Sequence, residues 1–362
     1  MQFIWRVLLI KSGYWMLQKS KLMKQKKIRI AAAVTTCYFS SRFSLLKKLV
    51  PVAQTVLLTD QHVYKSHASL FKGWNSIEFK AGESYKIQPT VDAVIEQLIH
   101  MKADRQTWLI GVGGGVITDL AGYIGAIYMR GINVGFVPTT LLAMVDAAVG
   151  GKNGIDHGNY KNLVGTIRQP SFLLYDSEFL KTLPEREWRN GFAEIIKHAA
   201  CFKPLWFREL EKNNLPYYQK NKKALALLIE KNALLKLSIV QQDESEQGLR
   251  RVLNFGHTLG HAIEMVYEVS HGEAIALGMV AAAKLSSQLT GFKDSNRLHQ
   301  LLMQYGLPTE ATYDLSKLMR VLEMDKKKAG KQVRYVLLKQ VGKAQVQLLP
   351  FTAVKNLLNQ LS

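Results

Sequence analysis

The sequence predicts an α/β domain followed by a mainly α-helical domain, and two patterns carry this prediction. Up to about residue 183, short apolar runs alternate with amphipathic helical stretches, which is typical of a parallel sheet covered by helices. From about residue 184 the strand patterns fade and long helical patterns follow. The chain has 362 residues, and at about 100–200 residues per domain we expect one domain over 29–183 and another over 184–362.

Each predicted strand of the first domain is a short apolar run that ends in a turn residue. The strands are predicted over Thr55–Thr59, Trp108–Val112, Val134–Val137 and Phe172–Tyr175. Helices are predicted between them, over Val91–Met101, Val116–Tyr128 and Leu141–Val149. Asp, Gly and Pro residues end the strand patterns, so they mark loops at the carboxyl ends of the strands.

In the second domain the apolar positions follow the helical period over longer stretches. We expect helices over Glu185–Ala200, Lys223–Val240, Gly256–Tyr267 and Glu273–Leu289. One strand is predicted late in the chain, over Val333–Leu338, after a basic turn at 325–328.

The composition is that of a globular protein, with 48% hydrophobic and 21% charged residues. Cys37 and Cys201 are the only cysteines, which is too few for a disulfide framework and favours a reducing cytoplasm. A bound metal would therefore need histidine and carboxylate ligands. No uninterrupted apolar run reaches about 18 residues, the length of a membrane span, so we expect no membrane partner.

The net charge is +20, and eleven Lys or Arg residues but no acidic residue precede Asp60. We interpret residues 1–28 as a basic, solvated N-terminal extension. A nucleic-acid-binding arm or a membrane-surface helix is the alternative, since clustered positive charges attract phosphates. We expect no nucleic-acid partner, because the stretch contains no recognised binding module. The remaining positive charge suits a small anionic substrate.

Three consecutive glycines, Gly113–Gly115, separate a predicted strand from a predicted helix. Glycines there let backbone N–H groups approach a pyrophosphate, and the helix N-terminus attracts negative charge. The spacing is not G-x-G-x-x-G, and glycines also form turns for purely structural reasons. However, Asp60 ends an earlier strand, and Thr139 and Thr140 end a later one, where their oxygens would meet a nucleotide. We therefore predict a Rossmann-like nucleotide-binding domain.

Histidines cluster in the second domain. His257 and His261 are four residues apart, so both can lie on one helix face, and His271 opens the next predicted helix. A catalytic Zn²⁺ typically takes three protein ligands and keeps one position open. Glu194 is the best carboxylate candidate, since an unpaired carboxylate on its apolar helix would be costly. A salt bridge to a basic residue one turn away is the structural alternative. We predict a metal-binding helical domain.

Several cationic residues lie beside glycines, helix ends or acidic residues rather than in charged runs. They are Arg130, Lys152, Lys161, Lys197, Lys236, Arg250 and Lys326. Each one alone is better explained as a solvated surface residue. Together they favour a substrate that carries phosphate and carboxylate groups.

The remaining signal is a set of longer motifs. They are GGGVITDLAG (113–122), RG (130–131), VPTTLLA (137–143), DAAVGGK (146–152), KNL (161–163), GFAEIIKH (191–198), DESEQGLR (243–250), LNFGHTLGHAIE (253–264) and HGEA (271–274). Over about residues 50–340 the chain closely resembles the 3-dehydroquinate synthases, with these motifs in the same order. The resemblance implies an N-terminal NAD-binding domain, a helical C-terminal domain, and one divalent metal in the cleft, most commonly zinc, with cobalt as an alternative.

The resemblance also assigns roles residue by residue. It implies Glu194, His257 and His271 as metal ligands and moves His261 to the substrate. The implied NAD contacts are Asp60, Glu83, Lys86, Gly115, Val116, Ile117, Thr118, Asp119, Thr139, Thr140, Lys152, Lys161 and Thr182. The implied catalytic and substrate-binding residues are Arg130, Asp146, Lys152, Asn162, Lys197, Lys236, Arg250, Asn254, His261 and Lys326. Thr118, Asn153 and the short interval 264–271 depart from the family pattern, but none of them removes a ligand.

The implied reaction converts 3-deoxy-D-arabino-heptulosonate 7-phosphate to 3-dehydroquinate and phosphate, in the shikimate pathway to chorismate and the aromatic amino acids. The NAD⁺ would oxidise the substrate transiently and be regenerated. We expect a cytoplasmic lyase, with a homodimer as an open alternative to a monomer.

Three rival functions remain at this stage. A sibling sugar phosphate cyclase would use substrates without the carboxylate, and the presence of Arg250, Asn254 and His261 argues against it. A metal-dependent polyol dehydrogenase would release NADH. A nucleic-acid-binding protein on an inactive scaffold would account for the net charge of +20.

Overall fold

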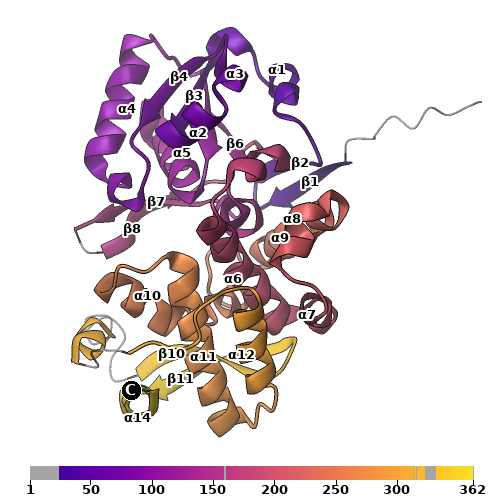
Figure 1. Ribbon diagram of the computed structural model, residues 1–362. Coiled ribbons are helices and arrows are strands. Elements are labelled where there is room, and N and C mark those ends of the chain that lie inside the picture. The colour runs from indigo at the N-terminus through magenta and orange to yellow at the C-terminus, as the bar shows by residue number, and fades with distance from the viewer. Residues whose placement is uncertain (1–23, 159, 313, 315, 323–331, 362) are drawn as a thin grey trace, which may run out of the picture.

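The structure is a computed structural model (Figure 1) that describes residues 24–158, 160–312, 314, 316–322 and 332–361. The first part of the predicted extension, 1–23, and the predicted substrate residue Lys326 lie outside the described residues. Residues 24–28, predicted as part of the same extension, belong to a strand of the sheet instead.

A seven-stranded sheet forms the first domain, with strand order β1-β2-β9-β6-β5-β3-β4. The strands are β1 (Lys24–Ile30), β2 (Ala33–Phe39), β3 (Thr55–Asp60), β4 (Asn75–Phe79), β5 (Trp108–Gly113), β6 (Asn133–Pro138) and β9 (Phe172–Leu174). Neighbouring strands are parallel except β1, which pairs antiparallel with β2 at one edge. The four predicted strands are confirmed as β3, β5, β6 and β9. Polar positions interrupt the apolar runs of the other three, so their periodicity did not predict them.

Helices cover both faces of the sheet, as a parallel sheet requires. The predicted helices α4 (Gln88–His100) and α5 (Gly115–Ile127) are confirmed and pack on one face. The other face is covered by short elements, η1 (Phe43–Leu45), α1 (Leu46–Leu49), α2 (Gln61–Ser66), α3 (Ala68–Phe71) and η6 (Ser177–Thr182). Side chains of successive residues in a strand point to opposite faces of the sheet. Val56 and Leu58 of β3 pack with α4 and α5, while Leu57 packs with the short elements on the other face.

The chain after β6 turns toward the second domain. The predicted helix over Leu141–Val149 is helical, but its residues Ala143–Ala147 form a π-helical turn, η5, which carries Asp146. Single π turns are often found at functional sites. An antiparallel hairpin that was not predicted follows, β7 (Lys152–His157) and β8 (Tyr160–Ile167), and lies on the side of the sheet that faces the second domain (Figure 1).

The second domain is mainly helical. Its elements are α6 (Glu185–Phe202), α7 (Pro204–Glu211), α8 (Leu215–Lys220), α9 (Lys222–Gln242), η7 (Leu249–Asn254), α10 (His257–Val266), α11 (His271–Thr290), α12 (Ser295–Gln304), β10 (Gln332–Gln340), β11 (Lys343–Pro350) and α14 (Phe351–Leu361). The four predicted helices are confirmed as α6, α9, α10 and α11, and the predicted strand as β10. Within the described ranges, none of the helices has the length and apolar character needed to cross a bilayer.

One apolar cluster joins the two domains. It runs from Leu58 and Phe136 in the sheet, through Val145 on η5, to Ile196 on α6 and Val240 on α9. Because this core is continuous, it holds α6 and α9 against η5 and gives the space between the domains a packed floor.

Candidate active site

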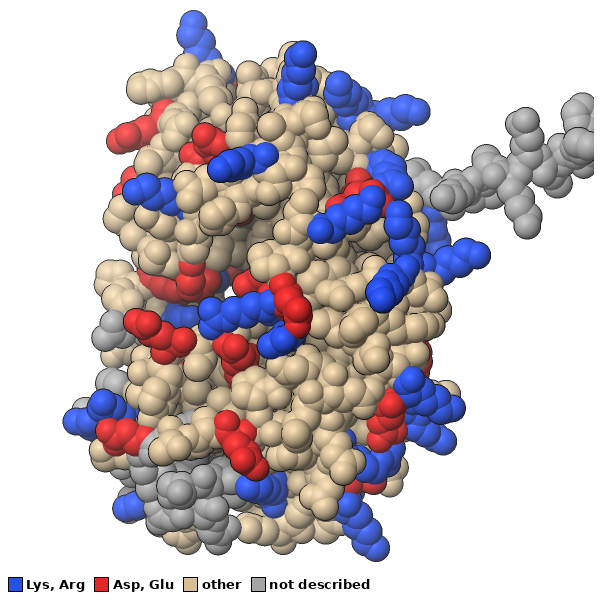
Figure 2. Space-filling view, in the orientation of Figure 1, with Lys and Arg blue, Asp and Glu red and all other residues tan. Residues whose placement is uncertain are grey.

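A cleft of about 1130 Å³ lies between the two domains. The first domain contributes the N-terminus of α5, η5 and the β7–β8 hairpin, and the second contributes residues of α6, α9, η7 and α10. Lys, Arg, Asp and Glu side chains gather where the domains meet (Figure 2). Ligand pockets typically measure about 300–1,000 Å³, so this cleft has room for a dinucleotide beside a second small molecule.

The glycine loop lies at the carboxyl edge of the sheet, between β5 and α5, as predicted. Gly113 is required by packing, since a Cβ there would overlap the Ile117 side chain. Gly115, the first residue of α5, lines the cleft. The Thr139 backbone N–H donates to Gly113 O at 2.9 Å, and the buried Thr139 hydroxyl has no hydrogen-bond partner among the described residues. The N–H groups at the start of α5 are therefore available to a ligand.

Lys86 connects the start of α5 to the hairpin. Its Nζ lies 2.5 Å from Asp119 Oδ2 and donates to Asn162 Oδ1 at 2.5 Å. The Asn162 backbone is left-handed, with φ 52°, and its N–H donates to Asp156 Oδ1 at 2.7 Å. Burial raises the pKa of the Asp119 carboxyl, and the Lys86 charge offsets only part of this effect. These contacts fix three residues of the predicted site beside the glycine loop.

Three predicted metal ligands meet in the second domain although they are distant in sequence. His271 Nε2 lies 3.2 Å from Glu194 Oε1, and His257 Nε2 lies 3.7 Å from the same oxygen. One donor atom from each residue lies within 4.8 Å of the other two. Two ligands of a tetrahedral Zn²⁺, each about 2.0–2.1 Å from it, are separated by about 3.4 Å. Two imidazoles and a carboxylate at these distances fit one ion.

The surroundings of the two histidines set their protonation. Phe255 O lies 3.2 Å from His257 Nδ1, so that nitrogen carries the proton and Nε2 keeps its lone pair. Burial, with the nearby charge of Lys197, lowers the pKa of His257 well below its usual value. Burial also acts to lower the pKa of His271, but contacts with two carboxylates outweigh it and raise the pKa to about 9. A metal must therefore displace a proton from His271.

Glu194 lies fully buried on α6, behind the two histidines. Its Oε2 contacts Lys197 Nζ, one turn along the helix, while Oε1 faces the imidazoles. Burial alone would raise the pKa of Glu194, but the Lys197 charge outweighs it and the pKa is lowered. The salt bridge and the ligand position, alternatives in the sequence, therefore occur together, one on each carboxylate oxygen.

Asp146 on η5 lies among basic groups at the floor of the cleft. Lys236 Nζ on α9 lies 2.9 Å from Asp146 Oδ1 and donates to its backbone oxygen at 2.8 Å. His198 Nε2 lies 3.5 Å from the same Oδ1, and its Nδ1 lies 3.0 Å from Asn232 Oδ1. Burial opposes ionisation of Asp146, but Lys236 and Lys197 hold its pKa well below the usual value. The ionised carboxylate thus fixes the Lys236 ammonium in the cleft.

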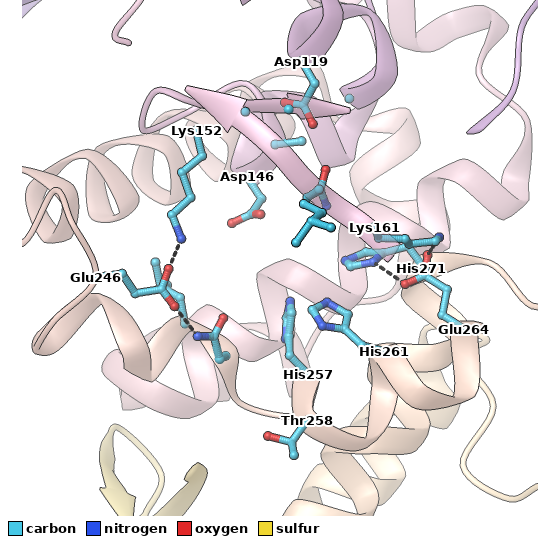
Figure 3. Close-up of a pocket in the computed structure, with 18 of the residues that line it drawn as sticks. Asp119, Asp146, Lys152, Lys161, Glu246, His257, Thr258, His261, Glu264 and His271 are labelled. Carbon is cyan, nitrogen blue, oxygen red and sulfur yellow. Dashed lines mark hydrogen bonds and ion pairs between the residues drawn. The ribbon is translucent and has the colours of Figure 1, made fainter. Parts of the chain in front are cut away.

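Cationic residues and one carboxylate form the wall near η7. Glu246 contacts both Lys152 Nζ and Asn254 Nδ2 (Figure 3). Arg250 is buried beside them and donates to two backbone oxygens, at 2.6 and 3.0 Å, which leaves further N–H groups free to bind a ligand. Burial, followed by the charges of Arg250 and Lys236, lowers the pKa of Lys152 to about 8, while the Asp146 and Asp243 carboxylates act in the opposite direction. Because the Glu246 carboxylate binds among these cations, an anionic group of a substrate could bind in the same place.

Some predicted residues lie outside the lining of this cleft. They are Asp60, Ile117, Thr118, Arg130, Thr139, Thr140, Thr182 and the fully buried Glu194. Asp60 Oδ1 accepts two backbone N–H groups at the start of α2, and the hydroxyls of Thr118 and Thr140 bond within their own turns. Thr182 pairs with His67, and Arg130 is exposed at the end of η4 (Tyr128–Arg130).

Three polar residues near the site were not assigned a role from the sequence. Glu246 and Glu264 line the cleft, and His198 lies behind it. The sequence alone does not distinguish an acidic residue that has charged partners in a cleft from one that is exposed to solvent. One signal was available for Glu264, because it continues the helix face of His257 and His261.

Two family models match most of the described chain. Residues 76–190 match the 3-dehydroquinate synthase N-terminal model, and residues 191–328 match the 3-dehydroquinate synthase C-terminal model. A curated 3-dehydroquinate synthase of Dehalococcoides mccartyi (strain CBDB1) is 38% identical over 318 residues, 84% of this chain and 89% of that protein. One of Saccharolobus solfataricus is 45% identical over 262 residues, 69% of this chain and 74% of that protein.

Solved structures of sugar phosphate cyclases have the same fold, which confirms the predicted fold class. A 2-deoxy-scyllo-inosose synthase complexed with carbaglucose-6-phosphate, NAD⁺ and Co²⁺ has a TM-score of 0.81 and 25% identity, covering 94% of this chain and 100% of that one. A 2-epi-5-epi-valiolone synthase from Streptomyces hygroscopicus subsp. jinggangensis 5008, with NAD⁺ and Zn²⁺ bound, has a TM-score of 0.81 and 23% identity, covering 99% of each chain.

Proposed function

The chain belongs to the 3-dehydroquinate synthase family, and from this premise we propose that it converts 3-deoxy-D-arabino-heptulosonate 7-phosphate to 3-dehydroquinate and phosphate. The observation that carries the proposal is the convergence of three elements in one cleft. They are a glycine loop at a helix N-terminus, a group of one carboxylate and two imidazoles, and a cationic wall. A reaction that oxidises, eliminates phosphate and reduces again needs all three.

We propose NAD⁺ and one divalent metal as cofactors. The solved inosose synthase holds NAD⁺ and Co²⁺, and the donor set here, two imidazoles and a carboxylate, equally suits Zn²⁺. When bound, NAD⁺ takes up and returns a hydride, and the metal lowers the pKa of the hydroxyl on the carbon that loses it. Glu194, His257 and His271 would hold the metal, and Gly113–Gly115 with the start of α5 would bind the pyrophosphate.

The other side chains of the cleft bind and orient the substrate in this proposal. Lys152, Asn162 and Lys197 hold the phosphate, so its charge is compensated while it leaves. Arg250 binds the carboxylate through the N–H groups that its backbone contacts leave free. Asn254 and His261 orient the reacting hydroxyls, and His261 can relay their protons.

The proposal predicts that NAD⁺ is a catalytic cofactor, because the substrate is oxidised and reduced within one cycle. The purified protein, incubated with the heptulosonate phosphate, should release phosphate over many turnovers per NAD⁺ and lose this activity with a metal chelator. Phosphate and NADH are measured together. NADH that accumulates in proportion to product would support a dehydrogenase instead. Turnover of glucose 6-phosphate, which resembles the ligand of the solved inosose synthase, with none of the heptulosonate phosphate would support a sibling cyclase.

A second prediction concerns pH. The pKa of Lys152 is lowered to about 8, so the side chain carries a positive charge below about pH 8 and loses this charge above it. If Lys152 binds the substrate phosphate, kcat/KM should fall above about pH 8, since kcat/KM reports the free enzyme. Lys152→Arg keeps its charge over this range and should move the fall to higher pH. A pH profile of kcat/KM that is identical in both proteins would contradict the assignment.

We further propose a cytoplasmic enzyme without nucleic-acid or membrane partners, in which a homodimer is an open alternative to a monomer. The two cysteines, Cys37 and Cys201, are free and buried, which supports a reducing compartment. Sedimentation of the purified protein would decide its assembly.

A further inference from the structure

The face of α10 that reaches the cleft carries three polar residues in register. His257, His261 and Glu264 stand at i, i+4 and i+7, which aligns them along the helix. The first is a proposed metal ligand and the second faces the substrate. The third has no role in the reaction proposed above. The Glu264 side chain is only 11% exposed, and a carboxylate that is mostly removed from water needs charged or hydrogen-bonding partners.

Glu264 has two such partners, one from each domain (Figure 3). Its Oε1 accepts from Lys161 Nζ on β8 at 2.7 Å. Its Oε2 lies 3.6 Å from His271 Nδ1, at the start of α11. The other nitrogen of the same ring, Nε2, lies 3.2 Å from Glu194 Oε1. The His271 ring is therefore placed between two carboxylates, one for each nitrogen.

The two nitrogens of a metal-bound imidazole have different tasks. When Nε2 is the ligand, the ring proton is on Nδ1, and a carboxylate that accepts this proton fixes the ring and makes Nε2 a better donor. Oε2 of Glu264 is close enough to Nδ1 for a small ring rotation to complete the hydrogen bond. Lys161 contacts the other oxygen of the same carboxylate, Oε1, from the opposite wall, and so leaves Oε2 to His271.

We propose that Glu264 is a positioning residue of the metal site, which accepts the Nδ1 proton of His271 and directs Nε2 toward Glu194 and His257. This inference rests on the proposed function, because it takes His271 as a metal ligand. It adds a requirement that the ligand set alone does not contain. The metal site is complete only with this carboxylate from α10.

The test measures zinc affinity without any turnover. Metal-free proteins are titrated with Zn²⁺ in competition with a chromogenic chelator, and circular dichroism checks that each variant is folded. Removal of such an outer carboxylate costs about 10–100-fold in metal affinity, so we expect a loss of this size in Glu264→Ala. Glu264→Gln should lie between Glu264→Ala and the parent protein, because its amide oxygen can accept the proton without the charge. Glu268→Gln, which neutralises an exposed carboxylate just after α10, is the matched control and should bind zinc within twofold of the parent protein.

Two further measurements separate this role from a simple ion pair across the cleft. Lys161→Met removes the ion pair but leaves the Glu264–His271 contact, so its zinc affinity should stay within about threefold of the parent protein, well short of the loss expected from Glu264→Ala. In the zinc-loaded protein with ¹⁵N-labelled histidine, the His271 Nδ1 proton should be protected from solvent exchange, and this protection should disappear in Glu264→Ala.

The outcomes against the inference are distinct from those against the proposed function. Zinc affinity of Glu264→Ala and Glu264→Gln within twofold of a tightly binding parent protein would overturn the role of Glu264 alone. A loss in Lys161→Met as large as that in Glu264→Ala would assign the effect to the ion pair and also overturn it. A folded parent protein that binds no zinc would overturn the metal site itself.

Discussion

Replacing His271 with alanine is expected to lower kcat by more than about a thousandfold and to release the bound metal. In the proposed site His271 would supply one of three donors, with Nε2 3.2 Å from Glu194 Oε1. A metal acting as a Lewis acid contributes several kcal/mol to transition-state stabilisation. Since about 1.4 kcal/mol changes a rate tenfold, a loss of about 4 kcal/mol gives this factor. Metal content per chain by elemental analysis and the rate of phosphate release are the two measurements.

The matched control for this variant is His100→Ala, which removes an exposed histidine at the end of α4. It should keep a full equivalent of metal and full turnover. Retention of a full equivalent of metal in His271→Ala would contradict the ligand assignment, whatever its activity.

Replacing Lys197 with methionine is expected to lower the free energy of unfolding of the metal-free protein by about 3–5 kcal/mol, the usual effect of removing one partner of a buried ion pair. Lys197 and Glu194 side chains are 2% and 0% exposed, and Lys197 also acts on the charge of Asp146. Methionine fills a similar volume but leaves both carboxylates without this countercharge. Urea unfolding of the metal-free variant and parent protein measures the difference.

Zinc should reverse part of this loss. A cation bound between Glu194 and the two histidines supplies positive charge where the ammonium was removed, so zinc should stabilise the variant more than the parent protein. Lys284→Met, which removes an exposed lysine from α11, is the control and should change stability by less than about 0.5 kcal/mol. A loss below about 1 kcal/mol in Lys197→Met would show that the buried carboxylates do not depend on Lys197 for their charge balance.

The sheet and the long helices could be predicted because their signals are local. The apolar runs of β3, β5, β6 and β9 and the helical period of α6, α9, α10 and α11 are each contained in one stretch of sequence. The strands β1, β2 and β4 and the β7–β8 hairpin were not predicted, because polar residues interrupt their apolar runs. The π turn η5 was not predicted either, because a helical sequence pattern does not distinguish a π turn from a regular helix.

The residue types of the site were also visible in the sequence, but their partners were not. The His257 and His261 spacing indicated a shared helix face, but spacing alone did not show that the structure brings His257 together with His271 and Glu194. The predicted contact of Asp60 with NAD stays a prediction, and only the structure shows that its Oδ1 caps the start of α2. A polar side chain forms hydrogen bonds with whichever donors the fold places within about 3 Å of it, and the sequence does not show which donors these are.

The class of the fold, the order of the predicted strands and helices and the family all follow from the sequence, because periodicity and motif order depend only on neighbours along the chain. How the buried charges are paired is visible only in the folded protein. The tertiary structure assigned one Glu194 oxygen to Lys197 and the other to the histidines, and it placed Glu264 between His271 and Lys161. Such sharing depends on distances of a few ångströms between segments far apart in sequence, and on burial that removes the competing water.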